Sequence, residues 1–130
     1  MDEREFFRTV AERTGLSREE AADLTRAALQ AIAQRLSEGA VRDLVVHLPD
    51  DLDQTMRTVK GRPNRRSGLN EAEEQVAERI GLTREEVHTG FGAVLSTLRE
   101  AVPEQEFEKA VSQLPGEFLR LMTEETPETS

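Results

Sequence analysis

The chain has two histidines, His47 and His88, and no cysteine, so few of its side chains are of types that commonly hold a metal. Glu85 and His88 are three residues apart, the spacing that places a carboxylate and an imidazole on one helix face in di-iron bundles. Such a centre needs a second motif of this kind, but the position 66 residues before His88 is Ala22. We therefore expect His88 to be an exposed histidine on a polar helix face, and we predict no metal and no cofactor.

The sequence also contains no recognisable motif for nucleophilic catalysis. Without cysteine there is no thiol nucleophile, and no serine stands in a nucleophile-elbow motif. No glycine-rich phosphate loop follows a strand. Carboxylates are abundant, but each has the position expected of a helix cap or an exposed helix face. We predict that the chain is not an enzyme, and keep as an alternative an enzyme or small-ligand binder with a pocket between two repeats.

A basic segment, residues 57–66, has five cationic side chains and no acid. They are the candidate contacts to phosphate or nucleic acid: Arg57, Lys60, Arg62, Arg65 and Arg66. The chain as a whole carries a net charge of −9, which leaves −14 outside this segment, and no aromatic residue lies between the arginines. A polyanion would be repelled by that charge. We expect an exposed loop that offsets acidic helices, with nucleic-acid association as the alternative.

The chain repeats itself at an offset of 66 residues. Residues 6–56 align on residues 72–122 without a gap, and 16 of the 51 positions are identical. Two unrelated segments of ordinary composition would match at about 3 positions. The identities are densest where "VAERTGLSREE" aligns with "VAERIGLTREE". This repeat predicts two copies of one supersecondary unit.

The most similar stretch in the two copies predicts a corner between helices. Gly15 and Gly81 suit the left-handed residue that ends a helix. Ser17 and Thr83 then act as N-caps, with a glutamate three residues further on to complete a capping box. The corner is therefore expected to have a structural role rather than to form a functional loop.

Apolar residues at three- and four-residue steps predict an amphipathic helix after each corner. Gly90 and Gly92 lie within the second of these helices and would permit close helix contact. The expected buried positions are Ala21, Leu24, Ala28, Leu29, Ile32 and Leu36 in the first copy, and Val87, Phe91, Val94, Leu95, Leu98 and Val102 in the second.

A third and a fourth helix complete each copy. The third is expected from Ser37 or Pro103, and the fourth after Pro49 or Pro115, because proline is tolerated in a first helical turn. No segment alternates for long enough to form a strand. The predicted fold is all-α, with two tandem pseudo-symmetric four-helix repeats packed into one helical domain. The expected boundaries are 1–58 for the first repeat, 59–69 for the basic linker, 70–124 for the second repeat and 125–130 for an acidic tail.

The composition of the chain restricts the cellular location and the binding partners that we expect. The N-terminus lacks the apolar stretch of a signal peptide, and no apolar run is long enough to span a membrane, so a cytoplasmic protein is expected. Tryptophan and tyrosine, which often anchor interfaces and stack on bases, are absent. The acidic balance argues against nucleic acid and anionic lipid as partners.

The repeated "VAERxGLxREE", the Ala/Leu helix, and "VRDLVVHLPDDL" with its counterpart "FEKAVSQLPGEF" resemble the DUF2267 family of small prokaryotic proteins. The resemblance extends from Glu5 to about Met122 and excludes the segment from Lys60 to Arg66. It implies an all-helical fold and supplies neither an activity nor catalytic residues. The leading functional hypothesis is a non-enzymatic helical interaction module that acts in stress adaptation. Its partner is expected to be a protein, either a second copy of the chain or another protein.

Overall fold

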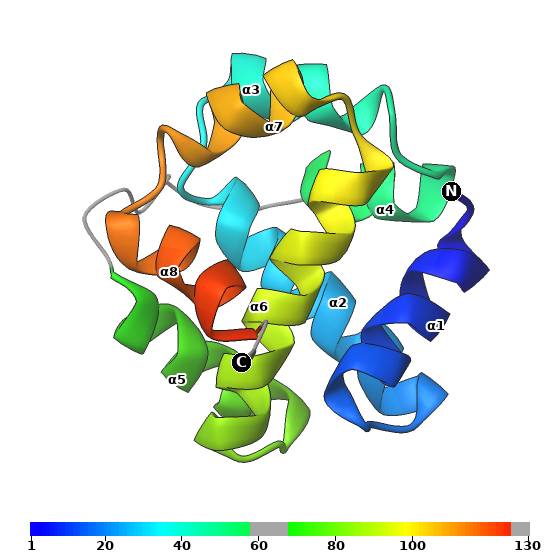
Figure 1. Ribbon diagram of the computed structural model, residues 1–130, viewed down its shortest axis with the longest axis vertical. Helices are drawn as coiled ribbons and strands as arrows, with labels where there is room; N and C mark the ends of the chain where they lie inside the picture. The colour runs from blue at the N-terminus through cyan, green and yellow to red at the C-terminus, as the bar shows by residue number, and fades with distance from the viewer. Residues whose placement is uncertain (58–67, 126–130) are drawn as a thin grey trace.

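The computed structural model describes residues 1–57 and 68–125, with side chains as far as Met122. These residues form eight α-helices and no strand (Figure 1). In chain order the helices are α1 (Glu3–Thr14), α2 (Arg18–Ala33), α3 (Glu38–Val45), α4 (Asp50–Arg57), α5 (Leu69–Ile80), α6 (Arg84–Ala101), α7 (Glu104–Val111) and α8 (Gly116–Glu125). The all-helical prediction is therefore confirmed.

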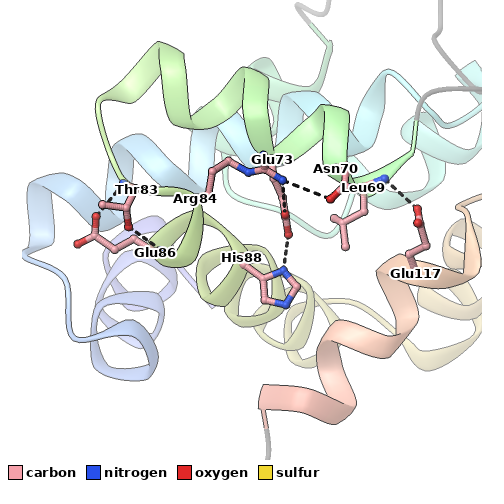
Figure 2. Close-up of polar contacts among 8 residues, drawn as sticks. All are labelled: Leu69, Asn70, Glu73, Thr83, Arg84, Glu86, His88 and Glu117. Atoms are coloured by element: carbon pink, nitrogen blue, oxygen red, sulfur yellow. Dashed lines mark hydrogen bonds and ion pairs between the residues drawn. The ribbon is translucent and has the colours of Figure 1, made fainter.

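The expected corners form through local hydrogen bonds. At the start of α2, Ser17 accepts from the backbone N–H of Glu20, whose carboxylate accepts from the N–H of Ser17. Thr83 and Glu86 make the same reciprocal pair at the start of α6 (Figure 2). Each pair satisfies N–H groups that have no partner within the helix, which fixes where α2 and α6 begin.

Two glycines end the helices before these corners. Gly15 has φ 78° and Gly81 has φ 75°, a left-handed conformation that other residues adopt at a cost. Their N–H groups donate to the carbonyls of Ala11 and Ala77. The chain thus turns at the same place in the repeated sequence each time, as predicted.

The longest helices, α2 and α6, pack against each other at the centre of the molecule (Figure 1). Helix α1 packs on both α2 and α6, and α5 also packs on both. Helix α4 lies on α2, α8 lies on α6, and α3 packs against α7 at one end of the central pair. Every residue of the two predicted apolar stripes is buried in one continuous core. This packing places the N-terminal end of α6 beside α5, where the candidate site lies.

Polar contacts also join parts of the chain that are distant in sequence. Arg13 of α1 donates to the Thr97 hydroxyl at 3.0 Å and pairs with Glu100 at 2.5 Å, both on α6. Arg79 of α5 donates to the side-chain carbonyl of Gln30 on α2. Helices α1 and α5 are therefore each held to a central helix by hydrogen bonds as well as by apolar packing.

Helices α3 and α7 are also held together by polar side chains. The amide group of Gln113 accepts from the Ser37 N–H at 2.8 Å and donates to the Ser37 hydroxyl at 3.2 Å. Asp43 lies 3.8 Å from the ammonium group of Lys109. The first contact gives the Ser37 N–H, at the start of α3, an acceptor that the helix itself does not supply.

Helix boundaries differ slightly from the expected limits of the linker. Leu69 was expected to be its last residue, but it is the first residue of α5 and is buried. The apolar side chain of Leu69 extends the α5 stripe by one turn, which explains the earlier start. Arg57, the first residue of the basic segment, is the last residue of α4. Among the described residues, no helix is long and apolar enough to cross a membrane.

Candidate functional site

A buried carboxylate lies between α5 and α6. The Glu73 side chain on α5 is only 5% exposed, and two groups from α6 contact it (Figure 2). Arg84 Nη2 lies 3.3 Å from Glu73 Oε1, and His88 Nδ1 lies 2.5 Å from Glu73 Oε2. Each carboxylate oxygen thus has a partner, as a buried charge requires. Glu73, Arg84 and His88 are called the α5–α6 cluster below.

The positions of Arg84 and His88 follow from the start of α6. The helix begins directly after the Thr83 cap, so Arg84 occupies its first position. Residues four apart project from the same helix face, so His88 joins Arg84 on the side that packs on α5. Arg84 Nη2 also lies 3.3 Å from Asn70 Oδ1. The corner that precedes α6 therefore determines where both side chains contact Glu73.

The cluster combines a buried acid with partly exposed donors. Arg84 is 48% exposed and His88 is 41% exposed, so both reach the surface from a buried anchor. An ionised carboxylate can only accept hydrogen bonds, so the Nδ1 nitrogen of His88 carries the proton in its contact with Glu73. In a neutral imidazole this tautomer leaves the lone pair on Nε2. The geometry therefore orients the ring and selects one of its two tautomers.

Helix α8 adds a contact at the N-terminal end of α5, one turn before Glu73. The carboxylate of Glu117 accepts from the backbone N–H of Leu69 at 2.9 Å (Figure 2). Gly68, the N-cap of α5, has no side chain for this purpose. Glu117 thus caps α5 from a distance and fixes the helix that carries Glu73.

Glu73 departs from the position expected of the carboxylates. All carboxylates were expected to be caps or exposed, but Glu73 is buried because it lies within the apolar stripe of α5. Leu69, Ala72 and Val76 are buried on the same face, at helical spacing from it. An acidic residue within such a stripe is a signal that could have identified it. His88, expected on an exposed polar face, is half-buried against this carboxylate.

Of the five predicted phosphate contacts, one lies in the described part of the chain. Arg57 is exposed on α4 and pairs with Asp53 one turn earlier on the same helix. The other four candidates lie outside the described residues: Lys60, Arg62, Arg65 and Arg66. Within residues 1–57 and 68–125, no group of three or more histidine, aspartate or glutamate side chains could hold a metal ion.

A second buried charge, Arg35, was also missed. Its side chain is fully buried at the end of α2, where it donates to the Ala31 carbonyl at 2.7 Å. Its guanidinium lies 5.9 Å from the centre of the Phe118 ring on α8, within cation–π range. Burial lowers the pKa of Arg35 from its usual value, and the charge of Glu71 opposes that change. The aligned position in the second copy is Ala101, so sequence symmetry gave no indication of it.

A known protein family is similar to this chain over most of its length. A family model described as an uncharacterized conserved protein (DUF2267) matches residues 3–121. No curated protein matches the chain.

Proposed function

Because the chain belongs to the DUF2267 family, whose description names no activity, we propose from its own structure that it is a non-enzymatic helical interaction module. Its two halves share one four-helix plan, and its binding surface includes the α5–α6 cluster. The observation that carries the proposal is the buried charge of Glu73, at a position where the other half of the chain has a phenylalanine.

The two-repeat plan is supported by the packing of aligned helices, which contact the two central helices in corresponding ways. Helix α1 packs on α2 and α6, and its aligned helix α5 packs on the same two helices. Likewise α4 lies on α2 as α8 lies on α6. Arg13 and Arg79 are aligned residues, and each donates to the central helix of the opposite half. Such exchange is what a pseudo-two-fold axis between α2 and α6 would produce.

The binding surface is supported by comparison of the aligned positions. Position 73 aligns with Phe7, and position 88 aligns with Ala22. The same helical plan therefore accepts apolar residues where the second half has Glu73 and His88. A buried ion pair often stabilises a fold no better than apolar residues of similar volume. We therefore attribute Glu73 and His88 to binding rather than to folding.

The chemistry of this surface suits a protein partner with exposed hydrogen-bond acceptors. Arg84 has donors left over after its contacts with Glu73 and Asn70, and nearly half of its side chain is exposed. Guanidinium groups are enriched at protein interfaces because they form directed pairs with carboxylates and carbonyls. Glu73 restricts the motion of Arg84 before binding, which reduces the entropy lost on association. The partner is a second copy of the chain or another protein.

The test is quantitative partner capture from the native cell, with chemical cross-linking and mass spectrometry. We expect wild type and Glu12→Ala, a control at an exposed α1 residue, to capture the same partner. The double variant Glu73→Met/His88→Ala should fold and lose that partner. Equal capture by the double variant would refute the assignment of the surface. Repeating the capture after stress would test the stress-related role, which stays a prediction from the sequence.

A further inference from the structure

We propose that Glu3 and Asp51 form an acid-responsive latch, which fastens the first turn of α1 to α4 when the two carboxyl groups share a proton. The inference concerns regulation within the fold and does not depend on partner binding. The evidence is the set of contacts that α1, α2 and α4 make around Asp51, together with a corresponding contact in the second half of the chain.

Side chains from three helices meet at Asp51. Its Oδ2 atom accepts from Nε and from Nη2 of Arg26 on α2, each at 3.2 Å. The guanidinium of Arg26 also lies 5.0 Å from the ring centre of Phe7 on α1. Glu3 is one turn before Phe7 on the same face of α1, and its side chain hydrogen-bonds with that of Asp51. The N-terminal end of α1 therefore lies beside α4 (Figure 1).

The second half of the chain has a contact at the same place. Glu3 and Asp51 align with Leu69 and Glu117. The Glu117 carboxylate accepts from the backbone N–H of Leu69 at 2.9 Å. In each half, a carboxylate of the fourth helix thus contacts the first residue of the first helix. The contact in the second half uses an amide proton, which does not dissociate near neutral pH, whereas the contact in the first half needs a proton that can be lost.

The shared proton is what allows the two carboxyl groups to bond. Two ionised carboxylates can only accept hydrogen bonds, and they repel each other. Arg26 offsets the charge of Asp51, so the proton resides on Glu3, whose O–H then donates to Asp51. The pKa of Glu3 is accordingly raised, first by this hydrogen bond, then by burial and by the charge of Asp51. The latch is therefore closed below the ordinary value of 4.5 and opens as pH rises through the raised value.

The charges around Glu3 support this assignment. Among the described residues, those whose charge acts on its pKa are two acids that raise it and one base that lowers it: Asp51, Asp2 and Arg26. Other acids of the neighbouring helices have partners of their own. On α4, Asp53 pairs with Arg57, and on α6, Glu100 pairs with Arg13 in the last turn of α1. The proton on Glu3 therefore depends mainly on the contact with α4.

The test is amide hydrogen exchange in the full chain, measured by NMR between about pH 4 and pH 7 and corrected for the intrinsic rate at each pH. The Phe6 N–H bonds to the Asp2 carbonyl at 3.0 Å, and the aligned Ala72 N–H bonds to the Gly68 carbonyl at 3.2 Å. Each amide thus reports the opening of the first turn of its helix. We expect opening at Phe6 to increase as pH rises through the pKa of Glu3, and opening at Ala72 to show no such change.

The size of the change follows from linkage. The opening constant at Phe6 should rise by about tenfold for each pH unit by which the pKa of Glu3 in the closed turn exceeds its value in the open turn. That pKa is measured in the same sample from the side-chain carboxyl resonance of Glu3. Titration of Glu3 at the ordinary value of 4.5, or equal pH dependence at Phe6 and Ala72, would overturn the proposal.

Variants separate the shared proton from the charge of Glu3. Glu3→Gln supplies an N–H donor at every pH, so Phe6 should stay protected across the range. Glu3→Ala removes both the donor and the charge, so Phe6 should exchange in acid as fast as it does in wild type at neutral pH. Glu12→Gln on the same helix is the control and should keep the wild-type pH dependence.

The two Glu3 variants decide the matter together. Equal exchange at Phe6 in Glu3→Gln and Glu3→Ala would show that no hydrogen bond to Asp51 holds the turn, and the proposal would fail. Partner capture plays no part in these outcomes, so failure here and failure of the proposed function can be told apart.

Discussion

The side chain of Leu24 on α2 fills the space that a β-carbon on Gly90 of α6 would occupy. A β-carbon built on Gly90 would lie 2.1 Å from Leu24 Cδ2 and 3.0 Å or less from the other two atoms of the isobutyl end. Leu24 is fully buried, so it has no open space to move into. The two residues occupy aligned positions, 66 apart in the sequence, at the crossing of the central helices.

Gly90→Ala should therefore destabilise the protein, although alanine is the better helix former. The gain in helix propensity is about 1 kcal/mol, and overpacking of a tight core typically costs about 1–3 kcal/mol. Leu24→Ala alone should cost about 2–5 kcal/mol through the cavity it leaves. The measurement is the free energy of unfolding in urea for each variant and for the double variant.

The double variant tests whether Leu24 is the cause. Removal of the leucine side chain should reverse the sign of the Gly90→Ala effect, which then becomes stabilising in the Leu24→Ala background. Additive effects would mean that the two residues do not compete for the same space.

The α5–α6 cluster should contribute little net stability. Glu73→Met/His88→Ala replaces the buried charge by an apolar side chain of similar volume, and should be neutral or stabilising by about 1–4 kcal/mol. Arg84→Ala instead leaves the buried carboxylate with one partner fewer, and should cost about 1–3 kcal/mol. Urea unfolding near neutral pH would show the contrast. Loss of stability in the double variant larger than in Arg84→Ala would show that Glu73 is kept for folding.

Helix α7 should accept a better cap. Its N-cap is Pro103, which supplies neither a capping side chain nor a backbone N–H, and the buried Oε1 of Glu106 has no hydrogen-bond partner among the described residues. The aligned Ser37 does cap α3, through the N–H of Ala40 at 3.1 Å. Pro103→Ser should supply both missing groups and complete a capping box with Glu106.

A double-mutant cycle measures this box separately from the loss of proline rigidity. Glu106→Ala should cost about 0.5–2 kcal/mol more in the Pro103→Ser background than in wild type, since only there does its carboxylate have a donor at the cap. The same cost in both backgrounds would exclude the capping box.

Removal of the negative charge of Glu3 should increase the stability of the folded protein near neutral pH. Its pKa is raised, first by the hydrogen bond with the Asp51 side chain, then by burial and by the charge of Asp51. A raised pKa in the folded state means that the stabilisation is present below the unfolded value of about 4.5 and is lost as pH rises through the folded value. Glu3→Gln should therefore stabilise the protein at pH 7, with a gain that shrinks below about pH 4.5. Glu12→Gln on the same helix is the control, and thermal unfolding at several pH values is the measurement.

The basic segment should not bind nucleic acid at physiological salt, because the net charge of −9 outweighs five cations. Fluorescence anisotropy with duplex DNA over a range of salt concentrations would test this. Tight binding that is lost on neutralising Arg62, Arg65 and Arg66 together would favour nucleic-acid association instead. The salt dependence would then flatten by about 3 in slope, at roughly 0.9 per phosphate contact.

The sequence was most informative where the cause is local. Capping boxes at Ser17 and Thr83 and the stops at Gly15 and Gly81 depend on residues within one turn, so the pattern was sufficient to place them. The buried stripes of α2 and α6 followed from helical spacing alone. Close contact at Gly90 was also expected from the glycine, although its partner was not.

The candidate site depends on contacts that no local pattern specifies. The burial of Glu73 results from the way α5 lies against α6, and the corner between them does not by itself fix that packing. Arg35 is buried because α8 brings Phe118 over it from the far end of the chain. The packing of α1 on α6 and of α5 on α2 likewise depends on tertiary contacts. Glu73 and Arg35 also align with residues of a different type, Phe7 and Ala101, so the sequence repeat gave no indication of either buried charge.

The contact between aligned residues has an evolutionary consequence. In a homodimer, a residue on the symmetry axis meets its own copy, so one gene must encode a side chain that is compatible with itself. Here Leu24 meets Gly90, and Asp43 meets Lys109, which are unlike pairs at aligned positions. Two leucines would collide at the first site, and two aspartates would repel at the second. Where both partners of such a contact belong to one polypeptide, the demand for self-complementarity does not arise, and aligned positions can hold residues as unlike as Glu73 and Phe7 or His88 and Ala22.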